Sequence, residues 1–238
     1  MQNIKKEVFL SNNNLLKEEL RALSRKEEGV FIDGAFYPSK YYDSSLKLLW
    51  ILKEPHGDAL DYPEFFTNEF DKFFTDLVCG VSRHTWATIA KISSNILNGY
   101  AMETEHATVM DRREEIQESL SKIAFININK DSSDTGGRSL NRNVTEARRY
   151  YDDFLERQID HLCPDMVICG NTFQFLRDKY GFPEVIKKKD EVDYVDHYFV
   201  GNTLYLDPYH PAYLAYGKIS EMSYINDIVR TVKDNSLK

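Results

Sequence analysis

The stretch LKLLWIL at residues 46–52 decides the fold, because it is apolar at nearly every position and ends abruptly at Lys53 and Glu54. A strand with one solvated face alternates apolar and polar residues, whereas a strand covered on both faces is apolar throughout. The stretch therefore predicts a central strand of a parallel sheet with helices over both faces. The polar turn KEPHG at residues 53–57 then lies at the carboxyl end of that strand.

Three further apolar runs have the same character, and we interpret them as strands of the same sheet. They are IAFINI at 123–128, DMVIC at 165–169 and TLYL at 203–206. In the segments between these runs, apolar residues recur at the spacing of one helical face. It predicts helices at 15–28, two within 63–100, and others at 112–121, 144–162, 171–180 and 219–232, with Asn143 capping the fifth. This alternation predicts a three-layer α/β/α fold around a central, mainly parallel four-stranded sheet.

Length and composition favour one domain. The chain has 238 residues, of which 42% are hydrophobic, so we expect a single domain over 1–238 with residues 1–45 as a helical and turn-rich lead-in. The polar start MQNIKKE lacks the apolar segment of a secretory signal, and no apolar run is long enough to span a membrane. We therefore expect a cytoplasmic monomer with no membrane contact.

The cysteines and the charge exclude several classes of function. Three cysteines without a CxxC pair argue against a disulfide framework and against a four-cysteine metal or iron–sulfur site, so we expect no metal and no cofactor. A net charge of -8 opposes indiscriminate attraction to nucleic acid. Any contact with nucleic acid must therefore use a local basic patch. Residues 130–149 and the KKK run at 187–189 are the candidates, with a solvated loop and a solvated helix end as the alternatives.

Polar residues follow each predicted strand, at the edge where open α/β sheets bind ligands. Glu54 precedes Pro55, which holds it extended, so its carboxylate can orient a water, stabilise a cation or cap a turn. His210 lies in a loop with two prolines and can donate a proton near neutral pH, or serve a structural role. Asn127 offers a donor and an acceptor together, which suits the edge of a nucleobase.

Three motifs and one further strand together resemble the uracil-DNA glycosylase superfamily. LKEPHG at 52–57 is similar to the family's first motif, G-Q-D-P-Y-H-G, and FININ at 125–129 is similar to its strand-end asparagine motif. HPAYL at 210–214 resembles the H-P-S-P-L loop, and PDMVICG at 164–170 resembles the penultimate strand with its glycine. The motifs occur in the family's order and span residues 48–216.

The resemblance implies a role for each matching residue. Glu54 would activate the water, Asn127 would read the base, and His210 would stabilise the departing base. Leu214 would be the wedge that fills the gap left by a flipped nucleotide. One ring of Phe65 and Phe66 would stack on the base while the other enters the core, although core packing is the alternative for both.

DNA, single- or double-stranded, is the partner that the resemblance implies. Lys130, Arg138 and Arg142 of the basic patch would contact its phosphates, which makes binding salt-dependent. The leading interpretation is a DNA glycosylase that removes uracil or a related damaged base. Altered motif residues keep two alternatives open: a glycosylase for another modified base, RNA or a nucleoside, and a non-catalytic nucleic-acid or nucleotide sensor.

Overall fold

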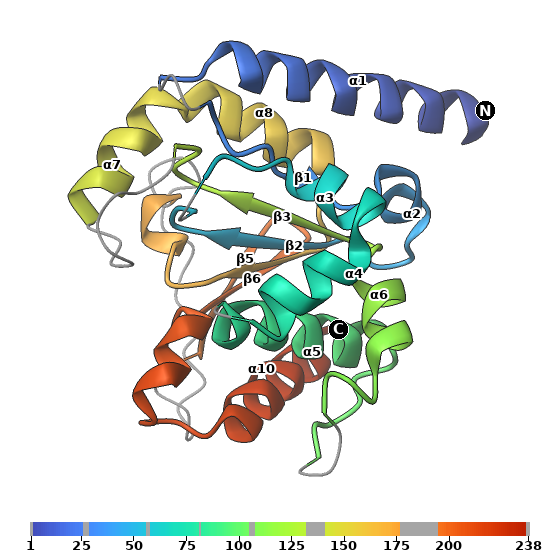
Figure 1. Ribbon diagram of the computed structural model, residues 1–238, viewed down its shortest axis with the longest axis vertical. Coiled ribbons are helices and arrows are strands. Elements are labelled where there is room, and N and C mark those ends of the chain that lie inside the picture. Colours follow the sequence, from blue (N-terminus) through green and yellow to red (C-terminus); the bar gives the residue numbers. More distant parts are fainter. Residues whose placement is uncertain are drawn as a thin grey trace.

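The computed structural model describes residues 2–25, 29–55, 58–80, 82–104, 108–131, 141–176 and 195–236. Within these residues, six strands form one mixed sheet in the order β1-β3-β2-β4-β6-β5 (Figure 1). The strands are β1 Gly34–Ala35, β2 Leu48–Leu52, β3 Ile123–Asn127, β4 Met166–Cys169, β5 Val195–Val200 and β6 Thr203–Pro208. The α/β class expected from the sequence is confirmed.

The four strands predicted from apolar runs lie side by side at the centre of the sheet. β2 pairs in parallel with β3 and β4, and β4 pairs in parallel with β6. Two antiparallel edge strands correct the predicted count of four to six. Neither carries a continuous apolar run: β1 has only two residues, and β5 begins with Val195, Asp196 and His197.

Helices cover both faces of the sheet, so the molecule has three layers (Figure 1). Along β2, Leu48, Trp50 and Leu52 face one layer, whereas Leu49 and Ile51 face the other. The first layer contains α3 Tyr62–Asn68, α4 Phe70–Phe73, the π-helix Phe74–Val78, α5 Arg83–Leu97, α6 Arg113–Leu120 and α10 Glu221–Ser236. The second contains α1 Gln2–Ala22, α2 Pro38–Asp43, α7 Asn141–Tyr150 and α8 Asp152–Leu162.

Three helix predictions are wrong in their bounds. The segment predicted as one helix over 144–162 is two, because the chain leaves helical geometry at Tyr151, and Asn143 lies within α7 instead of capping it. The first helix begins at Gln2, well before residue 15. Of the helix predicted at 171–180, the described part is only the 3-10 turn Phe173–Phe175, and residues 177–180 lie outside the described residues.

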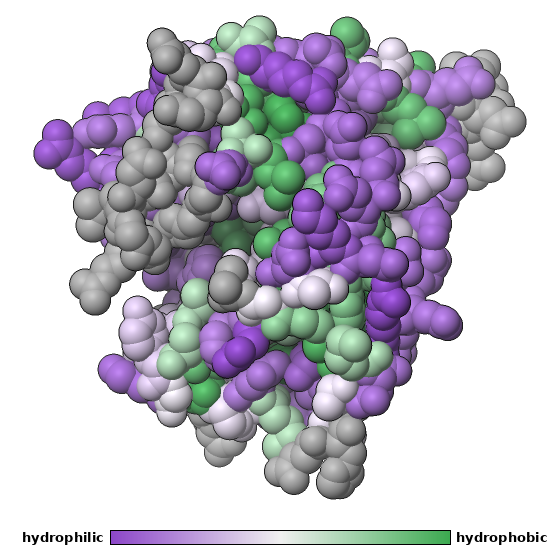
Figure 2. Space-filling view, viewed as in Figure 1, coloured by the Kyte–Doolittle hydropathy of each residue, from purple (hydrophilic) through white to green (hydrophobic). Residues whose placement is uncertain are grey.

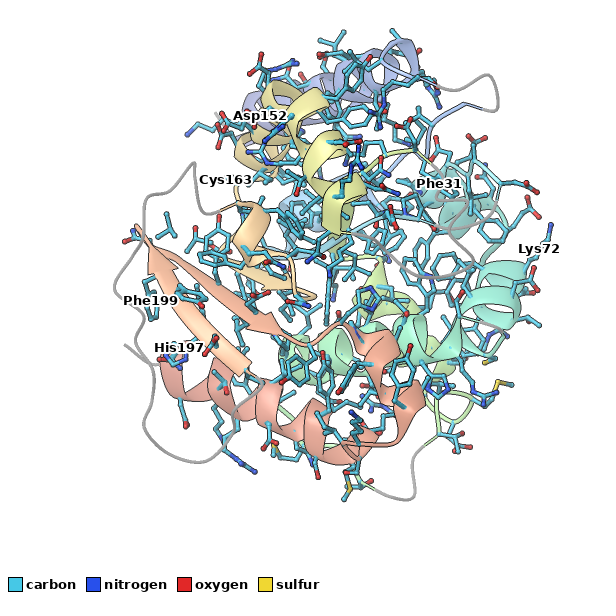
Figure 3. All side chains as sticks on the ribbon, turned by 90° about the vertical axis from the view of Figure 1, so that its left-hand side faces the viewer. Phe31, Lys72, Asp152, Cys163, His197 and Phe199 are labelled. Atoms are coloured by element: carbon cyan, nitrogen blue, oxygen red, sulfur yellow. The ribbon has the colours of Figure 1, made fainter. Side chains whose placement is uncertain are left out.

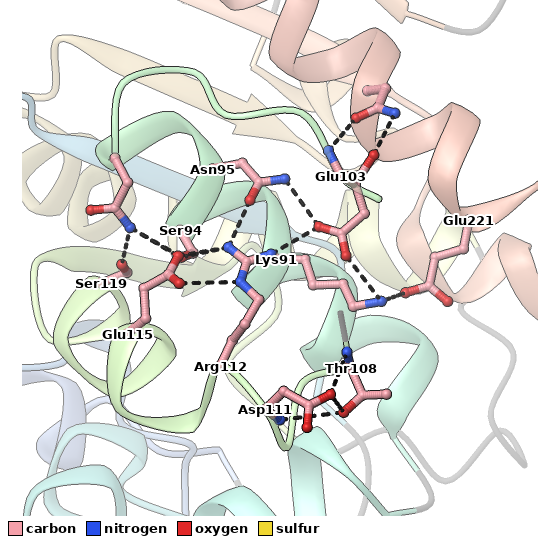
Figure 4. Close-up of polar contacts among 12 residues, drawn as sticks. Lys91, Ser94, Asn95, Glu103, Thr108, Asp111, Arg112, Glu115, Ser119 and Glu221 are labelled. Carbon is pink, nitrogen blue, oxygen red and sulfur yellow. Dashed lines mark hydrogen bonds and ion pairs between the residues drawn. The ribbon is translucent and has the colours of Figure 1, made fainter. Parts of the chain in front are cut away.

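A polar network fixes the helices of the first layer to one another (Figure 4). The Arg112 guanidinium donates to Glu103 Oε2 at 2.9 Å and to Asn95 Oδ1 at 2.7 Å. The backbone N–H of Glu103 donates to Asn226 Oδ1 of α10 at 2.6 Å. These bonds join α5, the start of α6 and α10. The network therefore makes α5 a firm support for η3, the 3-10 turn Pro211–Tyr216 that packs against it.

The surface differs from the core in composition. Figure 2 shows hydrophilic side chains over most of one face, with smaller apolar areas between them. Among the described residues, no helix has the length and apolar character that crossing a bilayer requires.

Candidate functional site at the strand ends

The carboxyl ends of β2 and β3 meet at the edge of the sheet that faces the viewer in Figure 3. Their pairing continues past the strands: Ile128 N–H donates to the Leu52 carbonyl at 2.9 Å, and Asn129 N–H donates to the Lys53 carbonyl at 2.8 Å. This pairing brings the residues after the two strands together. The Asn129 amide nitrogen accordingly lies 3.3 Å from Glu54 Oε2 and donates to it.

Glu54 is a buried carboxylate with one oxygen unused. Glu54 is 7% exposed. Pro55, which restricts the backbone of Glu54 to an extended conformation, is buried as well. While Oε2 accepts from Asn129, Oε1 is buried and has no hydrogen-bond partner among the described residues. An unsatisfied buried polar atom costs free energy and is uncommon in a native fold. Such an atom is a candidate for contact with a ligand or a water.

Asn127, the last residue of β3, presents a second unused atom. Its residue is 1% exposed, and its Nδ2 has no hydrogen-bond partner among the described residues. Its backbone N–H donates to Asp33 Oδ2 at 2.7 Å, which fixes the end of the strand. Because side chains alternate along a strand, Asn127 points to the same side of the sheet as Phe125, toward the first helical layer.

His210 approaches the same edge from the loop after β6. A Cβ added to Gly170, the residue after β4, would lie 3.5 Å from His210 Cδ2 and 2.5 Å from Leu52 Cδ2. A glycine is therefore required for Leu52 to come this close to the strand end, while the imidazole lies at ordinary van der Waals distance. His210 caps η3, and its Nδ1 accepts the N–H of Ala212 at 3.1 Å. The neutral ring therefore carries its proton on Nε2.

We call Glu54, Asn127, Asn129, Gly170 and His210 the strand-end site. Three residues predicted from the sequence, Glu54, Asn127 and His210, thus come from three different loops or strand ends to one edge of the sheet. The arrangement offers a carboxylate just after β2, an amide donor at the end of β3 and an imidazole donor in the loop after β6. Their roles remain predictions.

Lys130 requires a correction. It is completely buried, and its Nζ lies 2.8 Å and 2.9 Å from the two carboxylate oxygens of Asp33 and 2.8 Å from Gln158 Oε1. Burial lowers the pKa of the Lys130 ammonium, and the charge of Asp33 opposes that shift. A side chain enclosed in this way cannot contact a phosphate, so Lys130 is a structural residue of the second layer and not a DNA contact.

Leu214 is corrected for the same reason, since its side chain belongs to the core, whereas Phe66 occupies the core position that was expected for one of the two phenylalanine rings. Leu214 is 8% exposed and packs inward from η3, so it cannot act as a wedge between bases. Phe66 is 3% exposed, and its ring centroid lies 5.0 Å from that of Phe36 and 5.3 Å from that of Phe73. Phe65 is only partly buried, lies 5.8 Å from Phe73, and stays a prediction.

The arginine predictions have different outcomes. Arg142 is exposed on α7, where its Nε donates to Glu146 Oε1 at 2.9 Å, so a contact with phosphate stays a prediction. Arg138 and the run at 187–189 lie outside the described residues.

Asp207, near the end of β6, is a candidate that the sequence analysis missed. Its Oδ1 accepts the backbone N–H groups of Thr172 at 3.0 Å and Phe173 at 3.2 Å. Burial raises the pKa of Asp207 to about 7; these two donors and Lys53 oppose the shift, and Asp196 adds to it. A carboxyl group that titrates near neutral pH is a candidate proton carrier. Its place immediately before Pro208 at a strand end was the available signal.

Lys53 accompanies Asp207 on the second-layer side of the edge. Its Nζ donates to Asn141 Oδ1 of α7 at 3.2 Å. Burial lowers the pKa of Lys53, and the charges of Asp207 and Glu54 oppose that shift. The edge therefore carries both signs of charge beside the strand-end site.

The described residues contain no group of three or more His, Cys, Asp or Glu side chains placed to hold a metal ion. The chain matches no protein-family model, and no curated protein resembles it at a significant level. Function is therefore inferred from the strand-end site itself.

Proposed function

We propose that the protein is a hydrolase of the uracil-DNA glycosylase type, which cleaves the N-glycosidic bond of uracil or a related damaged base in DNA. The observation that carries the proposal is the pair of unused atoms at the ends of β2 and β3. Glu54 Oε1 and Asn127 Nδ2 are both buried and lack hydrogen-bond partners among the described residues. One is an acceptor and the other a donor, as a site for a polar ligand and a water requires.

Cleavage of an N-glycosidic bond needs opposite charges at its two ends. Positive charge develops on the sugar and negative charge on the departing base, so the site must place an anion near one and donors near the other. In the proposal, Glu54 orients the water that attacks C1′ and accepts its proton. The C1′–N bond breaks and its electron pair leaves on the base. The Nε2–H of His210 stabilises the resulting charge on the base.

Asn127 accounts for recognition of the base. The amide of its side chain offers an N–H donor to a carbonyl oxygen and a carbonyl acceptor to a ring N–H, and uracil presents that pair along one edge. The backbone bond from Asn127 to Asp33 holds the strand that carries this amide. A positioned amide of this kind discriminates between bases through the hydrogen bonds that the wrong base would leave unmade.

A substrate panel tests the proposal. The wild-type protein would be incubated with single-stranded uracil-DNA, duplex uracil-DNA, DNA with other modified bases, uracil-containing RNA and uridine. Free base would be measured by chromatography and abasic sites by alkaline strand cleavage. Release of uracil from DNA supports the proposal. If only another member of the panel releases its base, the protein is a glycosylase for that substrate instead. Binding without release of any base would indicate a non-catalytic sensor.

A further inference from the structure

Three tyrosine rings line the outer side of the segment that carries His210. Their centroids are 5.1 Å apart between Tyr209 and Tyr213 and 5.5 Å apart between Tyr213 and Tyr216. Tyr209 is 41% exposed and Tyr216 is 66% exposed, while Tyr213 is partly exposed between them. Lys218 Nζ lies 5.9 Å from the centre of the Tyr213 ring. We call Tyr209, Tyr213 and Tyr216 the tyrosine strip.

The segment that carries the tyrosine strip is anchored in the core and bonded to α10. Pro211 and Leu214 point inward and are buried, so η3 is anchored in the core on the side away from the strip. The hydroxyl of Tyr224 in α10 donates to the Tyr209 carbonyl. Residues three apart lie on one side of a 3-10 helix, which places the rings of Tyr213 and Tyr216 together. The rings are therefore positioned before any ligand arrives.

Core packing does not explain the strip. Single exposed aromatic residues are common on protein surfaces and need no explanation. Here, however, three rings follow one another at contact distance, a lysine accompanies them, and the segment belongs to the candidate site through His210. Proteins that bind unpaired nucleic acid use successive aromatic rings, on which bases stack, together with cations for the phosphates.

We propose that the tyrosine strip binds an unpaired nucleic-acid strand by stacking on the bases beside the target, so that the substrate is single-stranded. This inference rests on the proposed function for the choice of nucleic acid as the ligand. The burial of Leu214 agrees with it, because no side chain at that position is available to fill a gap in a duplex. An unpaired strand has no such gap, and its bases need not be extruded from a stack of pairs.

The charge of the chain supports stacking as the main source of affinity. With a net charge of -8, electrostatic attraction to phosphates is weak, and Lys218 supplies only a local cation. Base–aromatic stacking tolerates any sequence, since every base has a flat face. The strip should therefore bind with little sequence preference and with a shallow dependence on salt.

The test measures binding without catalysis. A fluorescently labelled single strand without uracil, and the same sequence as a duplex, would be titrated with the full-length protein while anisotropy is recorded. We expect the wild type to prefer the single strand. The double variant Tyr213→Ala/Tyr216→Ala should bind it at least about thirtyfold more weakly, because two stacking rings are lost and each stacked base contributes about fivefold or more. The double Tyr→Phe variant should bind nearly as the wild type, since the rings remain.

Tyr37→Ala is the matched control. Tyr37 is 43% exposed and has Lys40 Nζ 5.8 Å from its ring centre, but it precedes α2, away from the carboxyl ends of β2 and β3 (Figure 1). This variant should bind as the wild type. The proposal for the tyrosine strip would be overturned if the double alanine variant bound the single strand as tightly as the wild type does. It would also be overturned if the wild type bound the duplex as tightly as the single strand. Binding that depends on the strip without any base release would uphold it while refuting the glycosylase.

Discussion

Lys130 and Asp33 form an ion pair in which both side chains are fully buried, with Nζ 2.8 Å from Oδ1 and 2.9 Å from Oδ2. The same carboxylate accepts the backbone N–H of Asn127 at 2.7 Å. Gln158 Oε1 of α8 also accepts from Lys130 Nζ, at 2.8 Å, so the pair connects the second helical layer to the end of β3, where the base-reading residue is proposed. Residues that never reach the ligand thereby set the geometry of the site.

Removing one partner of this pair should destabilise the protein strongly. Asp33→Asn leaves the Lys130 ammonium buried without a counter-charge, which should cost about 3–5 kcal/mol in the free energy of unfolding. Lys130→Met should have a comparable effect. The double variant should recover much of that loss, because no isolated charge is left. Urea unfolding of all four proteins measures the coupling, and strictly additive losses would contradict it.

Replacing Asn127 should separate activity from stability. Its Nδ2 makes no hydrogen bond to the described residues, so Asn127→Ala removes no described side-chain bond and should change the free energy of unfolding by about 1 kcal/mol or less. Base release should fall about a hundredfold or more, as for other preorganised donors. Asn95→Ala is the control: its amide bonds to Glu103 and Arg112, so stability should fall while the activity of the folded fraction persists.

Asp207 should make stability depend on pH. Its pKa is raised from 3.8 to about 7 in the folded protein, so the folded state retains a proton that the unfolded state releases. Its contribution should therefore be fully present below about pH 4 and decline as pH rises to about 7. Asp207→Asn should flatten this part of the profile, measured by urea unfolding from pH 4 to 8. An unchanged slope would contradict the assignment.

Asp111→Asn is a control with the opposite pH dependence, in a lower pH range. Hydrogen bonds from Thr108 lower the pKa of the Asp111 carboxyl, so its stabilising contribution should be lost as pH falls. That loss occurs below about pH 4, so Asp111→Asn should leave the slope between pH 4 and 8 unchanged and should alter stability only in more acidic solution.

Gly170→Ala should disturb the strand-end site directly. The added methyl group would lie 2.5 Å from Leu52 Cδ2, so Leu52 must move, and His210 stands only 3.5 Å away. Overpacking of this kind costs about 1–3 kcal/mol. Base release should fall as well, because the shift of Leu52 disturbs the strand end against which the imidazole packs. Adding Leu52→Ala opens space for the methyl group and should restore part of the activity; no restoration would show that this contact is not the cause.

The centre of the fold was predictable because burial on both faces leaves a clear mark. The four central strands are apolar at nearly every position, and that pattern does not depend on distant residues. The edge strands have no such continuous apolar pattern. β1 owes its place to pairing with β3, and β5 has only intermediate burial at most positions. The break between α7 and α8 at Tyr151 also left no signal in the spacing of apolar residues.

The candidate site was predictable only in its outline. Strand ends identified Glu54, Asn127 and His210, because topology alone brings them to one edge. The Lys130 side chain is buried because it pairs with Asp33, which lies 97 residues away in the sequence, so its burial could not be predicted from neighbouring residues. Likewise, an aromatic or leucine side chain in a loop can face the core or the solvent, and only the packing of η3 determines that Leu214 turns inward while Tyr216 turns outward.

Base release from single-stranded uracil-DNA by the wild type and by Glu54→Gln shows whether Glu54 activates the attacking water. We expect release by the wild type and a loss of about a hundredfold to ten-thousandfold in the variant, since the carboxylate that accepts the proton is gone. Glu118→Gln, a change at an exposed carboxylate paired with Lys40, should retain the full rate. Release at the same rate by folded Glu54→Gln, or none by folded wild type, would contradict the account.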